Sequence, residues 1–251
     1  MNIFQVILLG IVQGITEWFP ISSSGHLVLF QKYFNIQADV FFDMALHIGS
    51  LIAILFLFRK DIIKIIKSFF GKEEKSYRNI GLLLILSTIV TGAIVLTFKD
   101  QFESLFNSTL TVGIALLITA ALLFLTKISK EKRKEVNMIN SIFIGLAQGF
   151  AFIPGISRSG ATISTGMFFG ITKEQAARYS FLLFIPTMIA SFLIKSYEVS
   201  YFNTNIVLGL IISAIVSFLI IKLLLKIIKS NKFHYFAYYC LILGILVILL
   251  Q

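Results

Sequence analysis

Two short polar turns hold most of the side chains in this sequence that could do chemistry. Residues 17–26 read Glu-Trp-Phe-Pro-Ile-Ser-Ser-Ser-Gly-His, and residues 154–162 read Pro-Gly-Ile-Ser-Arg-Ser-Gly-Ala-Thr. The Ser23 hydroxyl, close to His26 in the chain, is a candidate nucleophile with its base or hydrogen-bond partner. Arg158 in a serine- and glycine-rich turn suits phosphate, whose oxygens accept its forked donors together with backbone N–H groups. The two turns therefore indicate chemistry on a phosphorylated substrate.

Each of these side chains also has a simpler structural use. Serine is a common N-cap residue, so the serines could serve only to start a helix. Arg158 and Glu17 could form a salt bridge that only neutralises two buried charges. Three consecutive serines exceed what one cap requires, and an arginine beside the positive ends of helix dipoles favours an anion. We expect Arg158 to bind an anion, and these turns alone leave catalysis by Ser23 open.

A divalent cation is the cofactor that these residues would suit best. Gln13 and Glu17 stand one helical turn apart and share one face of a helix. Mg²⁺ is commonly held by one or two carboxylates together with phosphate oxygens, so Mg²⁺ or Ca²⁺ is expected beside the substrate. Acidic residues are too few for a two-metal site made by the protein alone. For Asp43 a favourable charge near a helix start has at least as much weight as a functional role. His47, one turn deeper, could line the cavity, but a hydrogen-bonded core position is slightly favoured.

The two turns belong to a sequence repeat. Residues 10–14 read Gly-Ile-Val-Gln-Gly and residues 145–149 read Gly-Leu-Ala-Gln-Gly, each ahead of one turn. In both copies a short apolar run stops at a polar turn and restarts, which is typical of a broken helix that dips into a membrane. Irregular backbone at bilayer depth is tolerated only where protein or a wet cavity satisfies its polar groups. The two turns are therefore the predicted working site.

The composition is that of a polytopic membrane protein. Hydrophobic residues make up 57% of the 251 residues and include 26 Phe, and the mean hydropathy is +0.92, more apolar surface than a soluble core could bury. Six segments are long enough to span a bilayer at ~1.5 Å per residue: residues 40–58, 79–98, 109–127, 176–195, 205–225 and 234–250. Residues 2–16 and 139–153 are too short. The predicted fold is one all-α integral membrane domain over residues 1–251, with a re-entrant helical hairpin and three transmembrane helices in each half.

The positive charges give the predicted orientation of the chain. The net charge is +10, but Lys and Arg stand in short loops between apolar spans, which argues against nucleic acid as a partner. Three basic regions hold 18 of the 22 Lys and Arg residues: 59–78, 127–138 with 173–178, and 222–232. These regions fall on one side, the cytoplasmic side, if each hairpin returns to the side from which it came. Three crossings per half then invert the second repeat, about 139–251, relative to the first, about 1–127, and the hairpins meet near the midplane.

At these residues the chain closely resembles the bacterial undecaprenyl-diphosphatase family, integral membrane enzymes also linked to bacitracin resistance. The resemblance covers essentially the whole chain and rests on four motifs: residues 13–17, 19–26, 42–49 (Phe-Asp-Met-Ala-Leu-His-Ile-Gly) and 154–162. It implies a metal or water-positioning role for Glu17, with Ser23 as nucleophile and His26 as the family histidine. Gln13 stands where other members have glutamate, which leaves one carboxylate of the pair. The phosphate-binding residues expected from the family motif and the same turns are Ser157, Arg158, Thr162, Ser22, Ser24 and Ser159.

The resemblance implies hydrolysis of undecaprenyl diphosphate to undecaprenyl phosphate and inorganic phosphate, which recycles the lipid carrier for cell-wall polymers. It places the chain in the bacterial inner membrane as a multi-pass protein with a polyprenyl diphosphate lipid as substrate, and leaves a homodimer open. We expect in-line attack by Ser23, with His26 taking or orienting its proton and Arg158 stabilising the phosphoryl oxygens. A secondary transporter or flippase for a phosphorylated lipid is the alternative, because paired broken helices also describe transporters.

Overall fold

The computed structural model describes residues 1–106, 108–133, 135–195 and 203–250. These residues form helices joined by turns, which confirms the all-α class. In chain order the helices are α1 (Ile3–Thr16), α2 (Ser23–Tyr33), α3 (Val40–Leu57), α4 (Arg59–Phe69), α5 (Lys75–Thr97), α6 (Lys99–Leu105), α7 (Thr109–Leu125), η1 (Thr126–Ile128), α8 (Met138–Phe150), α9 (Arg158–Phe168), α10 (Lys173–Lys195), α11 (Thr204–Lys229), η3 (Phe233–Tyr235) and α12 (Phe236–Leu249).

Long apolar helices confirm a polytopic membrane protein. Within the described residues, five helices are long and apolar enough to cross a membrane: α3, α5, α7 with the turn that follows it, α10 and α11. The sixth predicted span, residues 234–250, is shorter than expected. The apolar helical segment runs over Phe233–Leu249. Its first turn is the 3₁₀ helix η3, so the α-helical part, α12, has only 14 residues. The short runs at residues 2–16 and 139–153 fold as the helices α1 and α8.

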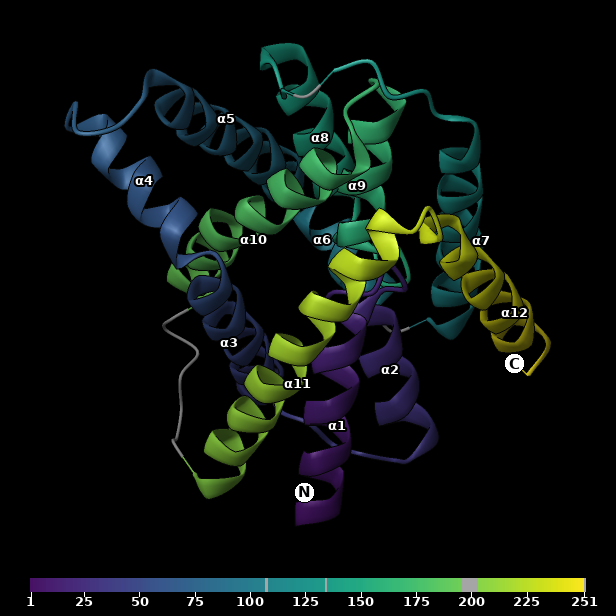
Figure 1. Cartoon of the computed structure of the whole chain (residues 1–251). Coiled ribbons are helices and arrows are strands. Elements are labelled where there is room, and N and C mark those ends of the chain that lie inside the picture. Colours follow the sequence, from purple (N-terminus) through teal and green to yellow (C-terminus); the bar gives the residue numbers. More distant parts are fainter. Residues whose placement is uncertain (107, 134, 196–202, 251) are drawn as a thin grey trace.

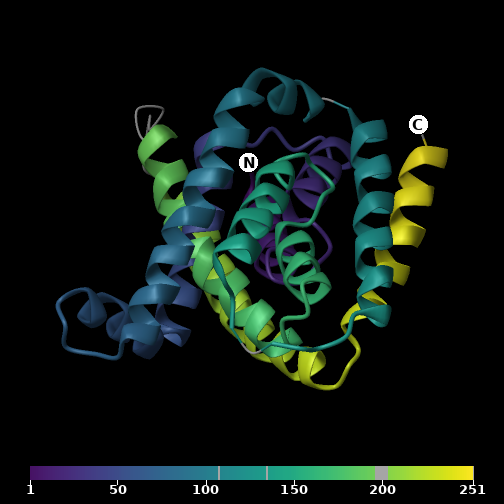
Figure 2. The same cartoon turned by 90° about the horizontal axis from the view of Figure 1, so that it is seen from above.

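Two helical hairpins occupy the middle of the molecule and point toward each other. The pair α1 and α2 rises from the lower half of Figure 1, and the pair α8 and α9 descends from the upper half. Figure 2 shows both hairpins surrounded by the longer helices. Each first helix begins with a reciprocal capping box, made by Asn2 with Gln5 in α1 and by Asn137 with Asn140 in α8. Such boxes satisfy two of the backbone N–H groups that a helix start leaves without partners.

Glycines allow each hairpin to lie close against one long helix. A Cβ added at Gly14 would lie 2.7 Å from Val216 Cβ on α11, and one added at Gly149 would lie 2.7 Å from Ile94 Cβ on α5. Small residues at helix contacts permit the close backbone approach on which packing within membranes depends. The repeated glycines of residues 10–14 and 145–149 therefore allow α1 to pack closely on α11 and α8 to pack closely on α5.

Two of the three basic segments lie in the same half of the fold. In Figure 1, α4 and the connection between α7 and α8 lie in the upper part, whereas the labelled N- and C-termini lie in the lower part. This arrangement agrees with the positions expected from the charge pattern. The inverted relation of the two repeats, their boundaries and the cytoplasmic side of the basic segments stay predictions.

Replacement of Gly145 by alanine is expected to destabilise the fold. An added Cβ would lie 2.7 Å from the backbone oxygen of Ser87, which cannot move aside as a side chain can. Overpacking of this kind costs roughly 1–3 kcal/mol, so Gly145→Ala should lower the melting temperature of the purified protein in detergent. Gly92→Ala on α5 is the matched control, since nothing lies within 4 Å of its added Cβ. Equal melting temperatures for the two variants would contradict this packing.

Candidate active site

The tips of the two hairpins touch through their backbones. Ser22 Oγ accepts a hydrogen bond of 3.1 Å from the Gly155 N–H. A Cβ added at Gly25 would lie 3.0 Å from both the N and the Cα of Gly155, so only glycine permits this approach. Gly155 also adopts a φ of 101°, in the region that favours glycine. The turns that the sequence singled out therefore form one joint surface.

The Glu17 carboxylate lies at the centre of this joint. Arg158 Nη2 donates to Glu17 Oε1 at 2.7 Å, an ion pair that links the second hairpin to the first. Ser23 Oγ donates to Glu17 Oε2 at 2.7 Å, and Gln13 Nε2 donates to the same oxygen at 2.9 Å. The Glu17 side chain is only 5% exposed. A carboxylate buried so deeply needs this set of donors, because an unpaired buried charge is strongly unfavourable.

Arg158 is held in place by aromatic rings as well as by Glu17. Its guanidinium carbon lies 4.3 Å from the centroid of the Phe184 ring and 5.9 Å from that of Trp18. Trp18 is fully buried and packs edge-on against Phe184 and Phe181 of α10. The Arg158 side chain is 15% exposed. The guanidinium is therefore fixed in one place while part of it stays within reach of a ligand.

The serines of the two turns confirm the capping interpretation in part. Ser22 caps α2 by accepting from the Gly25 N–H, and Ser157 caps α9 by accepting from the Gly160 N–H. Ser24 Oγ and Ser159 Oγ each lie 3.3 Å from the capping serine of their own turn. Ser23 is the exception, because its hydroxyl reaches Glu17 across the turn.

The second hairpin's predicted phosphate ligands are mostly enclosed by the protein. Thr162 Oγ1 lies 2.6 Å from Ser180 Oγ and also donates to the Arg158 backbone oxygen at 2.8 Å. Ser157, Ser159 and Thr162 are each only 1% exposed. Arg158 is therefore the predicted phosphate ligand of this hairpin that offers the most accessible donors.

The hydrogen bonds of His26 in the structure are made with groups other than Ser23. His26 Nδ1 lies 2.8 Å from the Ser22 backbone oxygen, and Nε2 lies 2.8 Å from the Tyr239 hydroxyl on α12. The imidazole and the Tyr239 ring also stack, with centroids 5.7 Å apart. Ser23 instead reaches Glu17, from a turn in which Ser22 has a φ of 70°. Glu17, and not His26, is the hydrogen-bond partner of the Ser23 hydroxyl.

His47 belongs to the Glu17 cluster, although the sequence slightly favoured a core position for it. Its Nδ1 lies 3.1 Å from Glu17 Oε2 and 2.8 Å from Gln13 Nε2. Asp43, one turn earlier on α3, instead accepts from Gln31 Nε2 on α2, at 2.9 and 3.0 Å. The spacing of Asp43 and His47 was visible in the sequence, but nothing there indicated that α3 would lie beside α1.

The donor set does not suit a cation held by the protein alone. Gln13 Oε1 is buried and has no hydrogen-bond partner among the described residues. Both oxygens of Glu17 already accept from other side chains. The described part of the chain contains no group of three or more His, Cys, Asp or Glu residues that could hold an ion. One free amide oxygen and one carboxylate that is already engaged by an arginine fall short of the six oxygens that Mg²⁺ prefers.

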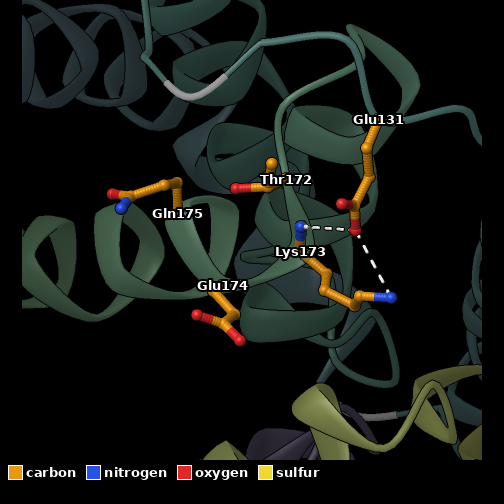
Figure 3. Close-up of a pocket in the computed structure, with 5 residues that line it drawn as sticks. All are labelled: Glu131, Thr172, Lys173, Glu174 and Gln175. Carbon is orange, nitrogen blue, oxygen red and sulfur yellow. Dashed lines mark hydrogen bonds and ion pairs between the residues drawn. The ribbon is translucent and has the colours of Figure 1, made fainter.

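Two hollows lie away from Glu17. A groove of about 630 Å³ between the first hairpin and α12 has aliphatic and aromatic walls and includes His26 and Tyr239. Such walls suit a lipid tail. The second hollow, of about 340 Å³, appears in Figure 3. There Glu131 Oε1 accepts from the backbone N–H of Lys173 at 3.4 Å and pairs with its Nζ at 3.3 Å, so this acid anchors a loop to the start of α10.

Comparison with known proteins agrees with the resemblance read from the motifs. A family model described as bacitracin resistance protein BacA matches residues 6–246. The undecaprenyl-diphosphatase of Methanosphaera stadtmanae is 41% identical over 272 residues, covering 100% of this chain and 99% of that protein. The undecaprenyl-diphosphatase of Halothermothrix orenii is 43% identical over 260 residues, covering 100% and 98%. That of Carboxydothermus hydrogenoformans is 39% identical over 263 residues, also covering 100% and 98%. The chain therefore belongs to the bacitracin resistance protein BacA family.

Proposed function

We propose that the chain hydrolyses undecaprenyl diphosphate to undecaprenyl phosphate and inorganic phosphate. The observation that carries this proposal is that the Ser23 hydroxyl and the Arg158 guanidinium are held on the two oxygens of one carboxylate, Glu17. A nucleophile, a proton acceptor and an anion ligand are thereby brought together where two helix starts converge. The names of the full-length relatives support the same reaction.

The geometry supports a serine nucleophile activated by Glu17. Ser23 Oγ attacks the terminal phosphorus while its proton passes to Glu17 Oε2, 2.7 Å away. The new bond joins Oγ to phosphorus, and the bond from phosphorus to the bridging oxygen breaks, so undecaprenyl phosphate leaves with that oxygen. Arg158 and the N–H groups at the starts of α2 and α9 stabilise the phosphoryl oxygens. Water then hydrolyses the seryl phosphate, which releases inorganic phosphate and restores Ser23.

Because the proposed substrate is a lipid, its tail and its diphosphate must lie in different environments. The tail remains in the apolar phase while the diphosphate reaches the hairpin tips from the side. We propose that the chain works as a multi-pass protein of the inner membrane, where carrier lipids of cell-wall synthesis are recycled. A homodimer stays a prediction. The alternative of a transporter or flippase has no support in the family or in the relatives, and transport alone requires no hydroxyl held on a carboxylate.

We propose that any divalent cation the reaction requires arrives with the diphosphate. The free Gln13 Oε1 would contribute one ligand, and the phosphate oxygens and water would contribute the others. Such an ion would supply charge neutralisation at the phosphoryl oxygens.

Loss of the Ser23 hydroxyl or of the Arg158 guanidinium is expected to reduce phosphate release strongly. Ser23→Ala removes the nucleophile and Arg158→Ala removes the anion ligand, so each should lower kcat/KM for undecaprenyl diphosphate by about 10²-fold or more. The measurement is phosphate release by the purified protein in detergent, with folding checked by size-exclusion chromatography. Ser104→Ala is the matched control, because this exposed hydroxyl on α6 bonds only to Gln101 O among the described contacts. A wild-type rate in Ser23→Ala would exclude the serine nucleophile.

Cation binding is expected to depend on the diphosphate. Calorimetric titration of the chelator-treated protein with Mg²⁺ or Ca²⁺ should give no site-specific heat, whereas the same titration with a methylene-bridged prenyl diphosphonate should give saturable binding. The physical reason is the shortage of free protein oxygens around Glu17. Gln13→Glu adds a carboxylate and should gain binding without the diphosphonate. Saturable binding to the unliganded wild-type protein would contradict the proposal.

A further inference from the structure

His47 joins the Glu17 cluster from a different part of the fold. Gln13 and Glu17 both belong to the first hairpin, whereas His47 comes from the spanning helix α3. Its Nδ1 lies 3.1 Å from Glu17 Oε2, the oxygen that also receives the Ser23 hydroxyl. Gln13 Nε2 lies 2.8 Å from the same ring nitrogen and 2.9 Å from the same carboxylate oxygen. The side chains of Ser23, Gln13 and His47 therefore all contact Glu17 Oε2.

We propose that His47 is a positioning residue of the active site, which with Gln13 fixes Glu17 Oε2 in the orientation that receives the Ser23 proton. This inference rests on the proposed function. Arg158 holds only the opposite oxygen, Oε1. The Ser23 hydroxyl on Oε2 is the group that reacts, so Gln13 and His47 are the contacts that keep Oε2 in place during attack. Contacts on both oxygens restrain rotation of the carboxylate about its last bond, and restraint of this kind is what keeps a reacting pair within productive distance.

The attachment of α3 to the fold does not depend on His47. Ser213 Oγ on α11 donates to the Leu46 backbone oxygen at 2.7 Å, and Ser217 Oγ donates to Ser50 Oγ at 3.0 Å. A Cβ added at Gly49 would run into the backbone of α11, which shows how closely the two helices pack. The His47 side chain is 26% exposed. Its replacement therefore leaves the α3–α11 contact in place and opens no enclosed cavity.

Paired substitutions of His47 distinguish a positioning role from a merely structural one. His47→Leu removes the nitrogen beside Glu17, whereas His47→Asn keeps a nitrogen donor near the place of Nδ1. We expect kcat for undecaprenyl diphosphate to fall about 10- to 100-fold in His47→Leu, with KM within about threefold of wild type. His47→Asn should recover most of the loss. His234→Leu on η3 is the matched histidine control and should keep wild-type kcat.

A second measurement tests whether His47 acts through Ser23 and Glu17. In a Ser23→Ala background, His47→Leu should cause no further loss, because residues that act as one unit are not additive. If His47→Leu does not fold in detergent, His47→Ala with imidazole added to the buffer takes its place, and imidazole should raise kcat. Wild-type kcat in His47→Leu, an equal loss in His47→Asn, or no response to imidazole would overturn the inference. Absence of phosphate release by the wild-type protein would instead overturn the proposed function.

Discussion

A single buried carboxylate constrains the whole arrangement. Glu17 is buried, and its charge is compensated by groups from four different helices: Gln13 of α1, Ser23 of α2, His47 of α3 and Arg158 of α9. Without these donors the ion would be several kcal/mol less stable than in water. The donors can assemble only if the tips of both hairpins meet. The charge at the reaction site and the shape of the fold are therefore two aspects of one requirement.

The two turns divide the work between equivalent positions of the repeat. Ser22 and Ser157 each cap the second helix of their hairpin by accepting from the glycine three residues later. The next residue in each turn, Ser23 in one and Arg158 in the other, then points toward Glu17. The same capping hydrogen bond thus precedes a hydroxyl in the first turn and a guanidinium in the second, although φ is 70° at Ser22 and -76° at Ser157. The capping serines supply the geometry, and the neighbouring residues supply the chemistry.

Local sequence predicted the parts of this structure that depend on local forces. The broken helices, the polar turns and five of the six spans follow from hydropathy, length and turn residues, and they are found where expected. Ser23, Glu17 and Arg158 were identified because charged and hydroxyl side chains at bilayer depth need a reason. The partners of the two histidines were not predictable in this way. His26 meets Tyr239 and His47 meets Glu17 only after α12 and α3 have packed beside the first hairpin, and side-chain periodicity carries no information on which helices become neighbours.

The backbone of Ser22 has a consequence for variation in this chain. Its φ of 70° is unfavourable for any residue with a Cβ, and such strain persists only where the surroundings enforce it. Glycine would relieve the strain but would lack the oxygen that receives the Gly25 and Gly155 N–H groups. Valine, isoleucine or threonine would tolerate the left-handed region even less. Replacement of Ser22 by glycine would therefore loosen the joint between the two hairpins, and replacement by a β-branched residue would add backbone strain at the same point.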